Sequence, residues 1–322
     1  MGVLIESALK TRLTDRLGIQ FPIIMAPMFL VSNIPMLIAA AESGIAGCIP
    51  ALNFRSHRSL LEGLKQLNER RICYGVNLIV NRTNYKLKAQ LKACLEYKVP
   101  FIITSLGNPG EVIQACKAKG IPVFCDVSTM DYARKAAQYG PDGLIAVTDQ
   151  AGGHLGGLAP EVLVPALKRE FPDLIVISAG GVGDFASFQE KMSLGADGVS
   201  VGTLFIASVE STVNPEYKQA CVDYDDSDIV NTTKLSGIPC TVIQTDYVRN
   251  MGTGTTVLRK LFGNSILLKK WFKLLTYKIG MLALYKAAFK NTYQHIWCAG
   301  RSIRYVHAVK PVRDWVDQLT HS

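Results

Sequence analysis

A histidine set among four glycines is the stretch of this sequence best suited to chemistry. His154 lies in Gly152-Gly153-His154-Leu155-Gly156-Gly157, shortly after the apolar run 143–147, which predicts a buried strand. So many glycines disfavour a helix or a strand interior, so we expect a loop whose backbone passes close to something flat or bulky. An imidazole there can take up a proton or donate a hydrogen bond. A glycine-rich turn with an incidental histidine is the plain alternative.

Two further glycine motifs follow the next two apolar runs. Gly180-Gly181 comes after the run 174–178, and Ser200-Val201-Gly202-Thr203 ends the run that starts at Gly198. Glycines let backbone N–H groups approach phosphate oxygens, and the Thr203 hydroxyl adds a further donor. The pair of motifs predicts a phosphate site, with two tight strand–helix turns as the alternative.

Short apolar runs alternate with helical patterns from residue 21 to residue 202. The predicted strands are 21–28, 44–49, 73–78, 101–104, 123–127, 143–147, 174–178 and 198–202. This order is the signature of an α/β fold of the (β/α)₈ TIM-barrel type, in which the loops after the strands share the face that carries the active site. A doubly wound open sheet is the structural rival, but its glycine-rich fingerprint would follow the first strand.

The alternation ends after Thr203, which suggests three parts. We expect a barrel over 1–208, a mostly helical basic subdomain over 209–296, and a closing segment over 297–322 that packs back on the barrel, with a helix over 303–319. Twelve of the 35 lysines and arginines lie between Tyr247 and Val312, where there is no aspartate or glutamate. The rest of the chain is slightly acidic, which argues against a general nucleic-acid-binding protein.

Cysteine spacing and hydropathy indicate what kind of site and location to expect for this protein. The eight cysteines form no C-x-x-C pair and no zinc spacing, so we expect buried thiols, a reducing compartment and no metal site. No apolar run approaches the length of about 18 residues that would predict a membrane span, and the N-terminus is too short and mixed for a signal peptide. The cytoplasm is the expected location. The oligomeric state stays open, a homodimer included.

A phosphate at the last two strands must belong to a substrate or a cofactor, and flavin mononucleotide (FMN) fits. Its ring would lie across the barrel mouth, backed by the apolar loop Met25-Ala26-Pro27-Met28 after the first strand. Asn77 at the end of the third strand can hydrogen-bond to ring or ribityl atoms. Core packing for this loop and a turn-forming role for Asn77 are the alternatives.

In this order the motifs resemble the nitronate monooxygenase family, once called 2-nitropropane dioxygenases. The resemblance extends from about Leu17 to Glu210 and resumes at 297–302. It implies an FMN-containing barrel that oxidises alkyl nitronates, and in some cases nitroalkanes, with dioxygen and without a metal. The family's active-site histidine would be His154. The cofactor contacts would fall on Met25, Ala26, Pro27, Met28, Asn77, Gln150, Gly153, Gly180, Gly181, Ser200, Gly202 and Thr203.

Three positions depart from the family pattern. Gln150 stands where members often have glutamate, Thr148 where many have glycine, and Asp126 near the position where some have a lysine. Glutamine in place of glutamate removes a negative charge close to His154 and the flavin, which would change pH dependence and substrate preference. The departures therefore bear on the reaction more than on the cofactor.

Two other functions stay open. One is an FMN-dependent enoyl-acyl-carrier-protein reductase of the same superfamily, which takes hydride from NAD(P)H. The basic segment Leu258–Lys290 would then dock an acidic carrier protein, with a solvated helix face or an interfacial helix on anionic lipid as the alternatives. The other, of a different class, is a barrel that binds a phosphate ligand and catalyses nothing. His154 beside the predicted flavin site argues against it.

Overall fold

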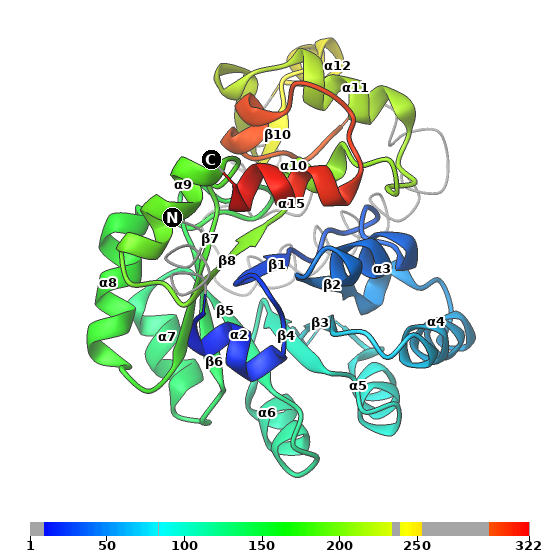
Figure 1. Ribbon diagram of the computed structural model, residues 1–322, viewed down its shortest axis with the longest axis vertical. Coiled ribbons are helices and arrows are strands. Elements are labelled where there is room, and N and C mark those ends of the chain that lie inside the picture. Colours follow the sequence, from blue (N-terminus) through cyan, green and yellow to red (C-terminus); the bar gives the residue numbers. More distant parts are fainter. Residues whose placement is uncertain (1–9, 83, 234–238, 253–295, 322) are drawn as a thin grey trace, which may run out of the picture.

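Eight parallel strands close into a barrel in the computed structural model, which describes residues 10–82, 84–233, 239–252 and 296–321 (Figure 1). Each strand pairs with the next in the chain, and β1 also pairs with β8, where Ile24 lies opposite Ser200. The predicted (β/α)₈ barrel is therefore confirmed. The strands are β1 Ile23–Met25, β2 Ala46–Pro50, β3 Tyr74–Ile79, β4 Phe101–Ser105, β5 Val123–Val127, β6 Gly143–Val147, β7 Ile175–Ala179 and β8 Gly198–Val201.

Helices follow the strands and form the outer layer of the barrel (Figure 1). Several begin at a side-chain cap: Asn33, Ser56, Thr129 and Asp184 each accept a hydrogen bond from a backbone N–H of the first turn. The helices of this layer are α3 Ile34–Glu42, α4 His57–Glu69, α5 Leu87–Glu96, α6 Gly110–Lys117, α7 Met130–Ala137, α8 Pro160–Glu170 and α9 Phe185–Ser193, with the short turn η1 Ala51–Asn53 before α4.

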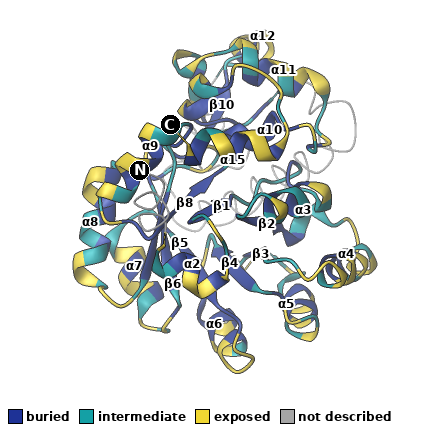
Figure 2. Ribbon diagram, viewed as in Figure 1, coloured by how far each residue is buried: buried dark blue, intermediate teal, exposed yellow. Residues whose placement is uncertain are grey.

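Two apolar clusters hold the barrel together. The inner cluster fills the lumen, where the rings of Phe101 and Phe124 meet edge to face with centroids 5.9 Å apart. Leu13 and Leu17 of α2 (Arg12–Leu17) belong to this cluster and cover the amino end of β8. The outer cluster lies between strands and helices, so the strands are buried on both faces while the helices expose only their outer sides (Figure 2).

Beyond β8 the described chain forms a group of short elements over 209–252, which we call the cap (Figure 1). Strands β9 and β10 of the cap pair antiparallel in a two-stranded sheet. The basic segment 258–290 lies outside the described residues, and the division of the chain at 208 and 296 stays a prediction. The elements are α10 Thr203–Ile206, directly before the cap, and α11 Pro215–Asp223, η2 Asp226–Asp228, β9 Ile229–Thr232, β10 Cys240–Ile243 and α12 Asp246–Met251 within it.

The closing segment differs from the single helix predicted over 303–319. It forms a short 3₁₀ turn, η3 Arg301–Tyr305, and a separate helix, α15 Val312–Thr320. Pro311 immediately precedes α15; proline has no N–H to donate and disfavours a helical residue before it, so the two pieces cannot join. Helix α15 packs on α3 and α9, and its buried Trp315 donates Nε1–H to the Ala207 carbonyl at 3.4 Å.

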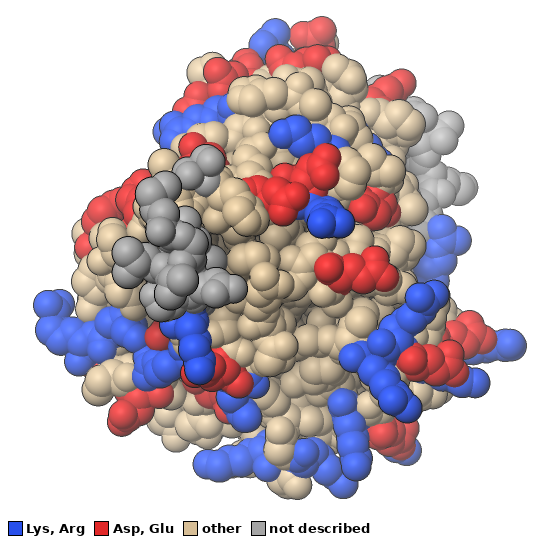
Figure 3. Space-filling view, viewed as in Figure 1, with Lys and Arg blue, Asp and Glu red and all other residues tan. Residues whose placement is uncertain are grey.

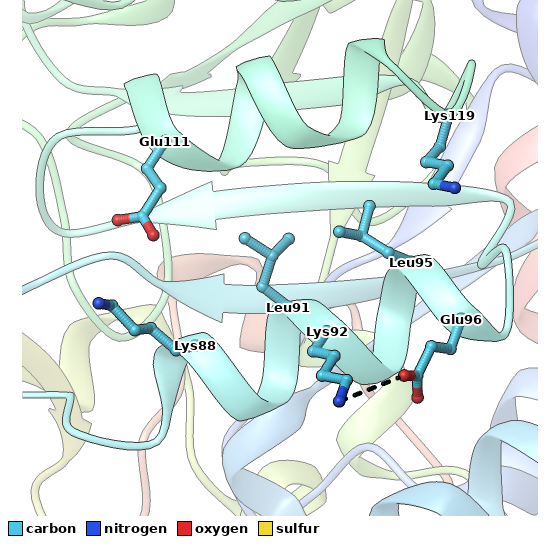
Figure 4. A pocket seen from close by; sticks show the side chains of 7 residues that line it. All are labelled: Lys88, Leu91, Lys92, Leu95, Glu96, Glu111 and Lys119. Atoms are coloured by element: carbon cyan, nitrogen blue, oxygen red, sulfur yellow. Dashed lines mark ion pairs between the residues drawn. The ribbon is translucent and has the colours of Figure 1, made fainter.

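The outer surface of the barrel carries many charged side chains. Lys and Arg side chains gather over α4, α5 and α6 along the lower edge of the view (Figure 3). A shallow groove between α5 and α6 has Leu91 and Leu95 as its floor and charged side chains around it, among them the Lys92–Glu96 pair at 3.7 Å (Figure 4). The groove belongs to the helical layer and not to the barrel lumen. Within the described part of the chain, no helix is long and apolar enough to cross a membrane.

A buried carboxylate ties the start of the described chain to the last two strands. Asp197, immediately before β8, accepts hydrogen bonds from the Arg12 guanidinium at 3.0 and 2.9 Å, from Lys168 Nζ at 3.0 Å and from the Val176 N–H at 2.8 Å. Burial raises the pKa of Asp197, but the hydrogen bonds outweigh this effect and hold the pKa below its ordinary value. The folded state therefore favours the ionised form.

Asp197→Ala should lower the free energy of unfolding at pH 7 by about 2–4 kcal/mol, because it removes the carboxylate that accepts from Arg12, Lys168 and the buried Val176 N–H. Since a lowered pKa stabilises only the ionised state, this contribution should be lost as the pH falls from the ordinary pKa of an aspartate through the folded-state value. Urea unfolding at pH 7 and in acid measures both effects. Glu62→Ala, which breaks the exposed Arg58–Glu62 pair, is the control and should cost less than about 1 kcal/mol. Equal losses in the two variants would contradict this account.

Candidate active site

Thr148 organises the loop that follows β6. Its N–H and its hydroxyl both donate to the Ala179 carbonyl at the end of β7, at 3.2 and 2.9 Å. Its own carbonyl accepts from the N–H groups of Ala151 and Gly156, at 3.2 and 3.0 Å. Thr148 is buried, and its hydrogen bonds join the loop 148–157, which we call the glycine–histidine loop, to the neighbouring strand.

The cap holds the same loop from the other side. The Gly153 N–H donates to Thr241 Oγ1 at 2.9 Å, and the Thr241 N–H donates to the Gly153 carbonyl, also at 2.9 Å. His154 and Cys240 form an isolated antiparallel bridge next to this pair. Strand β10 therefore continues its pairing onto the loop and fixes the backbone of His154. The sequence pattern did not point to Thr241, because a threonine in a short apolar strand looks like any other strand residue.

His154 is accessible to solvent, and its surroundings favour the neutral imidazole. Solvent reaches the residue, which is exposed, yet the protein atoms around it desolvate the charged form and lower its pKa below the ordinary value of a histidine. Near neutral pH the imidazole therefore carries one N–H donor and one lone pair. The structure places it on the barrel face that the sequence predicted.

The closing segment completes the site through two glycines. A Cβ on Gly152 would lie 2.8 Å from the Gly300 nitrogen, so the two backbones touch where no side chain fits. The Gly300 N–H donates to Thr203 Oγ1 at 3.0 Å. Because a hydroxyl has one proton and this bond uses a lone pair, the proton of the buried Thr203 can donate to a ligand. Gly300 lies in the segment 297–302, where the sequence resemblance resumes, but the sequence did not predict its contact with the site.

The loop after β7 brings two of the predicted contacts together. Gly180 and Gly181 have φ of +111° and +78°, which disfavour any residue with a Cβ. A Cβ on Gly181 would collide with Gln150 Oε1, so the Gln150 side chain lies directly against this glycine. Gln150, at the position where family members often have glutamate, therefore lies beside this glycine turn.

The loop after β1 lies next to the loop after β8. A Cβ on Gly202 would be 3.6 Å from Ala26 Cβ and from Met28 Sδ. Asn53 holds the loop by donating to the Met28 carbonyl at 3.1 Å, a contact that the sequence did not indicate. The buried Met25 side chain points instead to the outer core beside Leu37, so this predicted contact has only its backbone to offer.

Asn77 and Ser200 are on strands rather than loops. Asn77, 5% exposed, donates Nδ2–H to the Ile103 carbonyl at 3.2 Å and to Ser105 Oγ at 2.7 Å. Ser200, 7% exposed, lies opposite Ile24 and Ala179, which belong to or pack on the inner cluster. Both side chains therefore face the lumen near its carboxyl end.

The loops after β7 and β8 form a cradle that fits a phosphate. Among the described residues, no acceptor binds the backbone N–H groups of Gly181, Gly202 and Thr203. In proteins, phosphate oxygens accept hydrogen bonds from backbone N–H groups of this kind and from hydroxyls such as that of Thr203. Apolar Ala26 and Met28 on the adjacent loop suit a flat aromatic ring. The residues present thus fit FMN.

Comparison with known proteins identifies the family. The family model described as nitronate monooxygenase matches residues 51–322, which include every loop of the site except the one after β1. A probable nitronate monooxygenase from Staphylococcus saprophyticus is 28% identical over 290 residues, covering 76% of this chain and 81% of that protein. A 5-hydroxy-7a-methyl-1-oxo-octahydro-1H-indene-4-carboxyl-CoA dehydrogenase from Rhodococcus jostii is 27% identical over 247 residues, covering 76% and 69%.

Solved structures show the same fold. FabK from Thermotoga maritima superposes with a TM-score of 0.82 at 28% identity and covers 96% of this chain and 94% of that chain. A nitroalkane oxidase from Streptomyces ansochromogenes superposes with a TM-score of 0.76 at 21% identity, covering 95% and 96%, and shows likeness of fold alone.

Replacing Thr241 should loosen the glycine–histidine loop. Thr241→Val keeps the side-chain shape but removes the acceptor of the Gly153 N–H, which should lower the free energy of unfolding by about 1–3 kcal/mol. Amide hydrogen exchange over residues 150–156 should become faster. Thr241→Ser retains the hydroxyl and should exchange as slowly as the unsubstituted protein. Slow exchange in the valine variant would mean that the cap does not hold the loop.

Proposed function

This chain belongs to the nitronate monooxygenase family and is a flavin-dependent oxidoreductase, and we propose that it binds FMN and oxidises alkyl nitronates with dioxygen. The resemblance that the motifs predicted is thereby confirmed as far as the family. The observation that carries the proposal is the family match over 51–322, which contains His154 and both glycine loops of the cradle.

The cradle supports FMN as the form of the flavin. Gly181, Gly202 and Thr203 would hold its single phosphate, while Ala26, Pro27 and Met28 would back the ring and Asn77 would bind its polar edge. Bound there, FMN would supply the electron acceptor for the nitronate and the electron donor for dioxygen. Gln150 and Gly153 would border the ring from the loop after β6.

His154 supports the binding of a nitronate more than the deprotonation of a nitroalkane. A nitronate carries negative charge on its nitro oxygens, and a neutral imidazole can donate one hydrogen bond to them. Desolvation lowers the pKa of His154, and Gln150 brings no negative charge that would raise its basicity. We infer that His154 orients the anion, while the loop contacts through Thr148 and Thr241 keep its backbone in place.

A second function has specific support. FabK is an enoyl reductase that superposes over nearly the whole chain, and the Rhodococcus relative acts on a coenzyme A thioester. Reduction of an enoyl thioester by NAD(P)H therefore remains the second candidate, with an acidic carrier protein as partner. A barrel that binds a phosphate ligand without catalysis has no comparable support.

Anaerobic flavin reduction separates the two enzymatic functions. The purified protein should be yellow and should release a cofactor with the mass of FMN, not FAD, on denaturation. Propionate 3-nitronate should bleach the bound flavin in the absence of oxygen, while NADH and NADPH should do so slowly or not at all. Rapid reduction by a nicotinamide with an inert nitronate would favour the reductase. A colourless protein that takes up no FMN would contradict both enzymatic functions and favour the non-catalytic barrel.

The two roles of His154 predict different responses to His154→Asn. If His154 is a donor to the nitro group, asparagine replaces it in part, and rates with nitronate and nitroalkane should fall by a similar, modest factor. If it is the base for a neutral nitroalkane, that rate alone should fall by roughly 10²–10⁴-fold. Steady-state rates on flavin-replete protein decide, and we expect the first result. Unchanged rates with both substrates would remove His154 from the site.

A further inference from the structure

Three polar side chains from neighbouring strands form a hydrogen-bonded chain inside the barrel. Asn77 Nδ2 donates to Ser105 Oγ at 2.7 Å, and the Ser105 hydroxyl donates to Asp126 Oδ2 at 2.5 Å. The three residues lie on β3, β4 and β5, close to the carboxyl ends of these strands. They therefore stand at the end of the lumen where the loops of the candidate site meet.

Strand register explains why the three side chains meet. Ser105 and Asp126 follow by two positions Ile103 and Phe124, which fill the lumen, so they point to the same inner face. Ser105 and Asp126 also come one residue after the paired Thr104 and Cys125, which sets them opposite each other. Beneath them the lumen is apolar, so the chain of hydrogen bonds forms a polar layer on an apolar floor.

The direction of the hydrogen bonds fixes the orientation of the Asn77 amide. An ionised carboxylate only accepts, so Ser105 gives its single hydroxyl proton to Asp126 and can only accept from Asn77. The NH₂ group of Asn77 must therefore face Ser105, and it also donates to the Ile103 carbonyl at 3.2 Å. Asn77 Oδ1, which accepts no bond among the described residues, is left for a ligand that brings an N–H or O–H.

In the part of the chain that the structure describes, no positive charge contributes to the pKa of Asp126. Burial raises its pKa from the ordinary value to about 6, and the Ser105 hydrogen bond offsets this only in part. Among the described residues, the other titratable groups that act on it are the thiols of Cys48 on β2, which faces the lumen, and of Cys125, its neighbour in β5, which points to the outer core. Burial raises the pKa of both thiols, so neither carries charge at neutral pH. The carboxylate is thus held by a hydroxyl and not by an ion pair.

We propose that Asp126 is a positioning residue of the cofactor site: it holds the Ser105 hydroxyl, and Ser105 holds the Asn77 amide with its oxygen turned to accept a hydrogen bond from FMN. This inference rests on the proposed binding of FMN. Some family members have a lysine near this position. In this chain the Asp126 carboxylate would act on the cofactor indirectly, through Ser105 and Asn77. The acceptor property of Asp126 is what matters here, not its charge.

Binding of FMN to the cofactor-free protein tests this inference through rescue. Asp126→Ala and Ser105→Ala should each weaken FMN binding by about 10-fold, since each breaks the chain by one hydrogen bond. Asp126→Asn keeps an oxygen that accepts the Ser105 proton and should bind within about 2-fold of the unsubstituted protein. Quenching of FMN fluorescence measures all four proteins at pH 8. The absorption band of the bound flavin should shift in the two alanine variants and not in Asp126→Asn.

Thermal unfolding of the cofactor-free proteins checks that the variants fold. Because the pKa of Asp126 is raised, its ionised form costs stability as the pH rises through about 6, so Asp126→Asn should raise the Tm at pH 8 and leave it nearly unchanged at pH 4. Weak FMN binding in Asp126→Asn, or full binding in both alanine variants, would overturn the positioning role. Failure of the unsubstituted protein to bind FMN would instead overturn the proposed function.

Discussion

Pairing of β1 with β8 is the constraint on which the site depends. It joins the first strand of the barrel to the last, with Ile24 opposite Ser200 and the Ala26 N–H bonded to the Val201 carbonyl at 2.8 Å. Without it, the apolar loop after β1 would lie at one edge of an open sheet and the glycine turn after β8 at the other. Closure of the barrel sets these loops side by side. The apolar loop and the hydrogen-bond donors for a phosphate therefore lie on one face.

Electrostatics at this face are unusual for a site that is proposed to bind an anion. His154 is held neutral by desolvation, Gln150 is uncharged, and Asp126 has no cation among the described residues. Within the described ranges, the groups that can attract a phosphate or a nitronate are oriented N–H and O–H groups, which Gly181, Thr203 and His154 can provide. Dipoles of this kind act at short range, so they favour a ligand that fits closely over one that is only charged.

The sequence predicted the parts of the structure that depend on local pattern. Short apolar runs predicted the eight strands. Clustered glycines predicted the loops, because glycine allows a close approach of the backbone. Contacts between distant segments could not be foreseen: Thr241 with Gly153, Gly300 with Thr203, and Ser105 with Asp126 join residues that no periodicity links. The prediction of one closing helix over 303–319 was wrong. It relied on the apolar spacing and neglected Pro311, which separates η3 from α15. Met25 faces the outer core since alternate residues of a strand point to opposite sides.

The contact of Gly152 with Gly300 has a consequence for how relatives of this chain can diverge. Each glycine occupies the space that a side chain at the other would need, so the two positions act as one unit although they belong to different parts of the chain. A substitution at either position alone would push the closing segment away from Thr203. A relative with a larger residue at one of these positions must therefore also differ at the other, or lose the bond from the closing segment to Thr203. Covariation between these positions would then report on whether a relative retains the phosphate cradle.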